Sequence, residues 1–238
     1  MTEPSKRAQN KRDRRDRILK AAIEVFAQTG YSGASMNAIA TCAGLTKPTL
    51  YQYFPSKDAL FQAILAAPRD EMLLAFDAPD RVDMVALLYQ FAWRYASVAM
   101  RPEYLSLARL IIGEAHRFPA IGRDYQSSGP NKVLAGMMGF MCHHRDAGRL
   151  GFDDAELAAE DFWGLILSAP RNLALHVPDA DIGPEVLARY INNGLAVFLR
   201  AYSTSPATDL ATLARVIADP CEARNRNIDL FMRTDDGS

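Results

Sequence analysis

The sequence predicts an all-α protein, and three observations lead to that prediction. Apolar residues recur at helical spacing in residues 13–29 and again from about Asp70 onward, whereas no segment shows the alternation of a strand. Proline and glycine interrupt the pattern where helices would end. The 238 residues are 49% hydrophobic and 23% charged, which is typical of a globular chain that buries a sizeable core.

Residues 35–57 read SMNAIATCAGLTKPTLYQYFPSK and predict two short helices separated by a tight turn. The first helix covers about 36–42, and Ser35 is well placed as its N-cap. Gly44 ends it, because only glycine takes a left-handed conformation without a Cβ penalty. Thr46 then caps the second helix, where Pro48 is tolerated in the first turn. This arrangement predicts a helix-turn-helix, whose second helix lies in the DNA major groove.

Basic residues concentrate at the start of the chain. Residues 1–57 carry ten basic and four acidic residues, a net charge of +6, whereas the remainder carries −7. A polyanionic partner is therefore expected to meet only the N-terminal end. Residues 1–12 show no apolar periodicity and predict a flexible basic arm, either a solvated tail or an arm that follows DNA phosphates. Residues 13–29 predict the first helix, which Gly30 ends.

The three cysteines, Cys42, Cys142 and Cys221, lie far apart and match neither a disulfide framework nor a metal-binding spacing. No apolar run reaches the length of a membrane span. We therefore expect a cytoplasmic, nucleoid-associated protein with no cofactor.

The segment TGYSGASMNAIATCAGLTKPTLYQYFPSKDALFQAIL (29–65) resembles the N-terminal domain of the TetR/AcrR family of bacterial transcriptional regulators. The T-G-Y, the A-G-L turn and the L-Y-x-Y-F-x-S-K-x-x-L exit carry the resemblance. The segment LARLIIGEAHRFPAIGRDY (107–125) resembles a stretch of the C-terminal domain of AcrR-like members. The resemblance implies a non-enzymatic, homodimeric repressor that a small apolar or amphipathic ligand releases from operator DNA.

The fold expected on these grounds is a three-helix helix-turn-helix DNA-binding domain plus a larger helical-bundle domain for ligand binding and dimerisation. We expect the arm at 1–12, the DNA-binding domain at 13–57 and the bundle at 58–238. The expected phosphate contacts are Ser35, Lys47, Tyr51, Tyr53 and Lys57. The residues expected near base edges are Thr46, Thr49 and Gln52.

In the bundle, the proline and glycine breaks predict helices at 70–77, 81–101, 102–117, 119–127, 130–147, 154–176, 183–203 and 208–218. Pro68 is expected to kink or break the helix that begins after Ser56, where the head would join the body. Aromatic and methionine side chains at helical spacing form an adaptable core. Those expected to line a ligand pocket are Phe76, Phe91, Trp93, Met100, Met137, Met141 and Trp163.

Helix 183–203 is apolar on two faces, which suggests that it is covered on two sides. A dimer interface would provide the second cover, with a centrally buried helix in a monomer as the alternative. The residues expected at the interface are Phe162, Ile166, Leu187, Tyr190, Ile191 and Phe198.

Cys142, His143, His144 and His116 raise the alternative of a metal site. Adjacent histidines on a helix point about 100° apart, so we expect no metal there. Two other functions stay open: a ligand-independent activator or architectural DNA-binding protein, and a metal-binding helical bundle with an accessory DNA-binding head.

Overall fold

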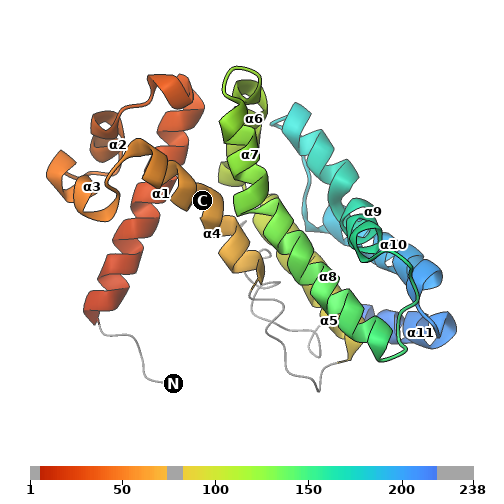
Figure 1. The fold of residues 1–238 in the computed structure, drawn as a ribbon. Helices are drawn as coiled ribbons and strands as arrows, with labels where there is room; N and C mark the ends of the chain where they lie inside the picture. Colours follow the sequence, from red (N-terminus) through yellow and green to blue (C-terminus); the bar gives the residue numbers. More distant parts are fainter. Residues whose placement is uncertain (1–5, 74–82, 219–238) are drawn as a thin grey trace. The chain divides into compact units, whose positions relative to one another are not determined.

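The computed structural model describes residues 6–73 and 83–218, and it confirms the all-α prediction. The helices are α1 (Lys6–Gly33), α2 (Met36–Cys42), α3 (Lys47–Tyr53), α4 (Lys57–Leu73), α5 (Met84–Ala99), α6 (Pro102–Ala115), α7 (Pro119–Ser128), α8 (Pro130–Asp146), α9 (Ala155–His176), α10 (Pro184–Tyr202) and α11 (Pro206–Ala218) (Figure 1). An isolated bridge between Leu150 and Ser203 is the sole β-type pairing in these residues.

The chain divides into two compact units. The first holds the described residues up to Pro68 together with Pro102–Gly129, and the second holds Arg69–Arg101 and the described residues from Pro130 onward. The unit that contains the helix-turn-helix is therefore larger than the segment 13–57, because α6 and α7 belong to it.

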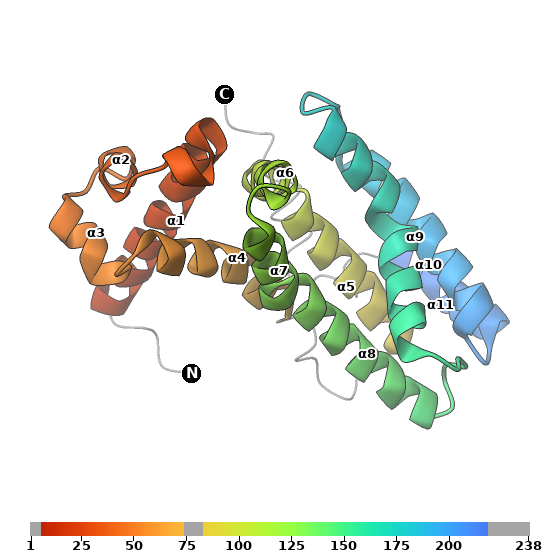
Figure 2. The ribbon, with the colours of Figure 1, turned by 45° about the horizontal axis from the view of Figure 1, so that its top comes forward.

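The core of the first unit forms around α1. Its Ile18, Ala22 and Phe26 are fully buried and share one apolar cluster with Ile39 of α2 and Leu50 of α3. Helices α2 and α3 lie on the same side of α1 (Figures 1 and 2). Leu107, Ile111 and Ile121, from α6 and α7, complete the cluster. The helix-turn-helix is thus held by one long helix and a short helical hairpin.

Helix α1 begins earlier than the sequence indicated. The prediction of a flexible arm is wrong for residues 6–12, which are helical, while residues 1–5 lie outside the described residues. Lysine, arginine, glutamine and alanine have high helix propensity, so this stretch extends a packed helix without an apolar stripe of its own. The Gln9 side chain also donates to Asp13 one turn later, at 2.8 Å.

Gly30 interrupts α1 at the predicted position. Its φ of +73° and ψ of 168° are not helical, and one further turn follows up to Gly33. A Cβ at Gly30 would lie 2.7 Å from Glu114 Oε1 of α6. Glycine therefore fits here for its backbone conformation, since the flexible end of the Glu114 side chain could move away from an added Cβ.

The sequence predicts a kink or break of the helix at Pro68, and a break is wrong, because α4 continues to Leu73 with Pro68 inside it. Proline removes one backbone N–H and therefore one hydrogen bond of the helix, which the surrounding turns tolerate here. Residues 70–73 extend α4 instead of starting a new helix, and the rest of predicted helix 70–77 lies outside the described residues. Pro170 lies inside α9 in the same way.

In the second unit, α9 and α10 form a closely packed pair (Figure 2). A Cβ at Gly194 would lie 2.6 Å from the carbonyl oxygen of Leu165 and 3.1 Å from Ile166 Cα. Glycine thus lets the backbone of α10 approach that of α9. Phe162 and Phe198 pack edge to face next to this crossing, with ring centroids 5.5 Å apart.

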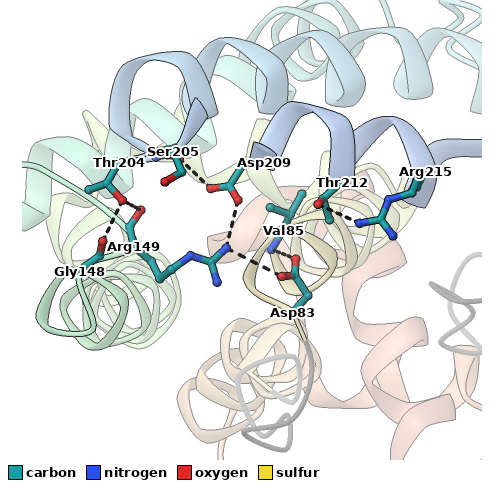
Figure 3. A network of polar contacts seen from close by, with 10 residues as sticks. Asp83, Val85, Gly148, Arg149, Thr204, Ser205, Asp209, Thr212 and Arg215 are labelled. Atoms are coloured by element: carbon teal, nitrogen blue, oxygen red, sulfur yellow. Dashed lines mark hydrogen bonds and ion pairs between the residues drawn. The ribbon is translucent and has the colours of Figure 1, made fainter. Parts of the chain in front are cut away.

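A buried carboxylate joins three connections of the second unit (Figure 3). Asp209 of α11 is 2% exposed and accepts hydrogen bonds from Arg149 Nη2 at 3.0 Å and from Ser203 Oγ at 2.7 Å. The same Arg149 nitrogen lies 3.8 Å from Asp83, the N-cap of α5. This network ties the α8–α9 and α10–α11 connections to the start of α5, so it stabilises the bundle.

Candidate functional site

The helix-turn-helix has the caps that the sequence predicts. Ser35 Oγ accepts from Ala38 N at 3.1 Å, and Thr46 Oγ1 accepts from Thr49 N at 3.4 Å. Gly44 in the turn has φ +64°. Side-chain caps and a left-handed glycine set both helix ends locally, so the angle between α2 and α3 is encoded within this short segment.

Helix α3 presents a polar face outward and an apolar face inward. Lys47, Tyr51 and Gln52 are exposed, and Tyr51 is 43% exposed. Leu50 is fully buried between them. An exposed lysine, phenol and amide along two turns of helix can contact phosphates and base edges.

The remaining predicted DNA contacts differ in exposure. Ser35 and Thr46 are exposed but their hydroxyls already cap helices, and the Thr46 hydroxyl lies 2.8 Å from that of Thr49. Thr49 and Tyr53 are half-buried, and Tyr53 packs against the core of the unit. Capping hydroxyls and half-buried side chains can reach DNA only with their outer atoms, so Lys47, Tyr51 and Gln52 form the most accessible part of this face.

Lys57 makes contacts within the protein in addition to the predicted phosphate contact, which stays a prediction. Its Nζ donates to the carbonyl oxygens of Tyr31 at 2.7 Å and Ala34 at 3.1 Å, and lies 4.7 Å from the centroid of the Tyr31 ring. Two of the three ammonium donors therefore bind the segment 31–34, which covers the last turn of α1 and the residue after it. These contacts also make Lys57 a structural lock between this segment and α4.

Tyr31 is the centre of that lock, a role that the sequence did not predict. Its ring packs with Phe26 and Phe61, with centroids 5.5 Å and 4.9 Å apart, and its hydroxyl donates to Asp58 of α4. Burial and the hydrogen bond to Asp58 raise the pKa of Tyr31. The T-G-Y segment could have indicated it, since a tyrosine directly after the glycine that ends α1 is well placed to pack back on the core.

Arg15 of α1 adds a cation near the end of the helix-turn-helix. Its guanidinium carbon lies 5.6 Å from the centroid of Phe54, the residue that caps the C-terminus of α3. Lys11, Arg12 and Arg14 are exposed on the same helix. The extended N-terminal part of α1 therefore carries positive charge in helical form next to α3.

Most residues predicted to line a ligand pocket belong to the packed core. Five of them are at most 9% exposed: Phe91, Trp93, Met100, Met137 and Met141. Phe76 lies outside the described residues. Trp163 lines a groove of about 460 Å³ along α9, together with Tyr95, Glu160, Gly164, Leu167, Ser168, Ala169, Arg171, Asn172 and Leu175.

The predicted dimer-interface residues are largely internal to one chain. Phe162, Ile166, Leu187, Ile191 and Phe198 are all 0% exposed. They form the seam between α9 and α10, so their assignment to an intermolecular interface is wrong. Tyr190, at 37%, is exposed. The second apolar face of α10, which includes Val186, Tyr190 and Val197, is the one that faces outward.

In the described residues, no group of three or more histidine, cysteine or acidic side chains is placed to hold a metal ion. The rings of His143 and His144 lie 5.1 Å apart at nearly right angles. Burial lowers the pKa of His144, and the neighbouring His143 lowers it further. The Phe140 ring packs against His144 one turn later in α8, with centroids 4.3 Å apart, so His144 makes a ring contact within its own helix.

Comparison with known proteins identifies the family. Residues 18–64 match the family described as "Bacterial regulatory proteins, tetR family", and residues 86–204 match "AefR-like transcriptional repressor, C-terminal domain". The second match alone covers half of the chain. The chain belongs to the TetR family of transcriptional regulators. It is therefore a DNA-binding regulator and not an enzyme, and the recognised resemblance is confirmed.

Two solved structures show the similarity over most of the chain. A TetR-family regulator from Mesorhizobium loti is 30% identical, with a TM-score of 0.66, and the match covers 81% of this chain and 98% of that one. The flavonoid-responsive regulator FrrA is 32% identical, with a TM-score of 0.63 and the same coverage. The shared fold thus includes the C-terminal helical domain as well as the helix-turn-helix.

Among curated proteins, the regulator UidR of Escherichia coli K12 is 43% identical over 65 residues. That match covers 27% of this chain and about a third (33%) of UidR. The similarity to this relative is therefore confined to one part of each protein. None of the described helices is long and apolar enough to cross a membrane.

Proposed function

We propose that this TetR-family regulator is a homodimeric repressor that a small ligand releases from its operator. The observation that carries the DNA-binding part is helix α3, whose ends are fixed by Thr46 and Phe54 and whose exposed face carries Lys47, Tyr51 and Gln52. In this proposal Lys47 and Tyr51 contact phosphates and Gln52 reads a base edge. The description of the matched C-terminal domain as that of a repressor supports the negative sign of regulation.

The residue that reads the base can be tested directly. Replacing Gln52 with alanine removes a side chain that can pair with a base edge, which reduces operator affinity by about 1–3 kcal/mol. Gln28→Ala, an exposed glutamine of α1, is the matched control and leaves affinity unchanged. Fluorescence anisotropy with operator and scrambled duplexes measures both. Equal loss on both duplexes for Gln52→Ala would contradict a role in base recognition.

The outward face of α9 and α10 supports the dimer. The described residues contain eight large hydrophobic side chains that are exposed, and five of them lie on these two helices: Leu157, Leu173, Val186, Tyr190 and Val197. Val177, the C-cap of α9, is a sixth. Exposed apolar patches of this kind mark interaction surfaces. Val186, Tyr190 and Val197 share one face of α10, which a second copy of that face would cover around a two-fold axis. The two heads would then meet the two halves of a palindromic operator.

The oligomeric state tests this face. Val197→Asp places a charge in the proposed interface and is expected to shift the protein from dimer to monomer in sedimentation velocity at micromolar concentration. Ile112→Asp on α6 is the control, because Ile112 is 66% exposed but lies in the other compact unit. A Val197→Asp protein that remains dimeric, or a wild-type protein that is monomeric, would contradict the proposed interface.

The effector part of the proposal rests on the family and on the groove along α9. Ligand binding is expected to favour a state of the protein that binds the operator less well. Because coupling free energies are reciprocal, the operator would weaken ligand binding by the same factor. Equal ligand affinity for the free and the operator-bound protein would leave only a ligand-independent regulator.

A further inference from the structure

We infer that the groove along α9 binds a planar aromatic molecule that carries an anionic oxygen, held by Trp163 and Tyr95 at one part and by Arg171 at another. This inference deepens the proposed function, on which it rests, by giving the chemical class of the effector. It narrows the expected apolar or amphipathic ligand to one with a negative charge.

Arg171 supplies the positive charge that would bind an anionic ligand in the groove. Its guanidinium is permanently positive, its side chain is half-buried, and among the described residues it has neither an ion pair nor a hydrogen bond. Its Nε is buried without an acceptor. The Nε itself is enclosed, so an anionic oxygen that enters the groove would bind the terminal Nη groups of this half-buried, unpaired cation.

The expectation of an aromatic ligand follows from the packed rings of Trp163 and Tyr95. Trp163 and Tyr95 pack with centroids 4.3 Å apart and a tilt of 36°, and Leu167 and Leu175 line the groove beside them. Aromatic and aliphatic side chains of this kind suit a flat ring. Eight helical residues separate Trp163 from Arg171 by about 12 Å along the axis, and a long side chain on a helix leans toward its N-terminus. A ligand of two or three rings can therefore span both groups.

The one carboxylate that lines the groove lies away from the cation. Glu160 is eleven residues before Arg171, about 16 Å along the helix axis, and it is exposed. The groove is thus apolar around Trp163 and Leu167 and positive toward Arg171. Gly164, Ser168 and Asn172 of the lining are exposed.

The test uses 2-naphthoate, which is a two-ring carboxylate, and 2-naphthamide, its neutral counterpart, in calorimetric titrations of the full chain without DNA. Naphthoate is expected to bind about tenfold more tightly than the amide, as a hydrogen bond to a charged group implies. Arg171→Gln is expected to remove that preference and leave amide binding unchanged. Arg215→Gln on α11, which bonds Thr212 and does not line the groove, is the charge-matched control.

An ionised hydroxyflavone, titrated alongside, distinguishes a phenolate from a carboxylate as the natural anion. Whichever of the two binds more tightly, the inference requires that Arg171→Gln weakens it about tenfold. In a Trp93→Phe background, Trp163 is the sole tryptophan, so quenching of its fluorescence locates the ligand. Melting curves show that each variant is folded.

Equal affinity for acid and amide, an Arg171→Gln protein that keeps the preference, or no saturable binding of any probe would overturn the inference. These titrations contain no DNA. Failure here therefore refutes the ligand class alone, whereas failure to select an operator refutes the proposed function and leaves the binding result standing.

Discussion

Replacing Lys57 with methionine separates a structural role from a DNA contact. Methionine keeps the aliphatic stem of the side chain but removes the ammonium, which donates to Tyr31 O at 2.7 Å and to Ala34 O at 3.1 Å. Hydrogen bonds from charged donors contribute about 1.5–3 kcal/mol each. Lys57 is half-buried, so water can take over part of the hydrogen bonding that the ammonium provides. We therefore expect the free energy of unfolding to fall by roughly 2–3 kcal/mol in total.

For a chain of this size, that loss corresponds to a melting temperature lower by roughly 4–10 °C, measured by circular dichroism. The matched control is Lys47→Met. Lys47 is exposed on α3 and has no hydrogen bond or ion pair among the described residues. Its replacement is expected to leave the melting temperature unchanged.

The two variants should also differ in DNA binding. If Lys47 contacts one phosphate in each protomer, its loss reduces the slope of log affinity against log salt by roughly 1.8 for a dimer. Lys57→Met should change this slope by much less once the protein is kept below its melting temperature. The reasoning is refuted if Lys57→Met melts like the wild type and loses as much salt dependence as Lys47→Met.

Three further predictions concern packing. Gly194→Ala introduces a Cβ 2.6 Å from the backbone of α9 and should destabilise the protein by about 1–3 kcal/mol. Gly139→Ala in α8, where an added Cβ would have nothing within 4 Å, should stabilise it by about 0.5–1 kcal/mol. Urea denaturation compares the two variants, and equal effects would contradict the close approach of α9 and α10. Asp209→Ala leaves Arg149 without its buried partner and should lower the free energy of unfolding by about 2 kcal/mol; an unchanged urea midpoint would count against the network. Gly30→Ala forces a side chain into a positive φ and should cost about 1–2 kcal/mol in thermal melts, and a neutral result would show that α1 can continue through this position.

Local signals predicted the helix-turn-helix well. The caps Ser35 and Thr46, the left-handed Gly44 and the inward Leu50 depend on neighbours within a few residues, so the sequence contains nearly all the information that sets them. The same holds for the proline-marked starts of α6, α7, α8 and α10.

Features that depend on distant partners were predicted less well. Helix α10 has two apolar faces, and periodicity alone does not say which one packs inside the chain. The face with Leu187 and Ile191 is internal because Gly194 lets α9 approach there, a glycine whose significance appears only when Leu165 is seen beside it. The membership of α6 and α7 in the N-terminal unit is likewise a long-range property.

In the candidate site, too, features set by local sequence were predicted well and features set by distant residues were not. The outward position of Lys47 and Gln52 follows from helical geometry, but Lys57 is held by carbonyl groups more than twenty residues earlier in the chain. The groove along α9 depends on which aromatic residues are left partly uncovered after packing. Of the seven pocket residues predicted from composition and spacing, six either lie in the core or fall outside the described residues.

Selection of random duplex DNA with the purified protein, at a fixed salt concentration, tests the central claim most directly. A dimer of helix-turn-helix heads is expected to enrich a palindrome whose half-sites lie about one helical turn apart or somewhat more. The enriched sequence should compete with bound operator far better than a scrambled duplex. Binding that falls with salt but enriches no sequence would contradict the account, because it would show only a basic surface on a helical protein.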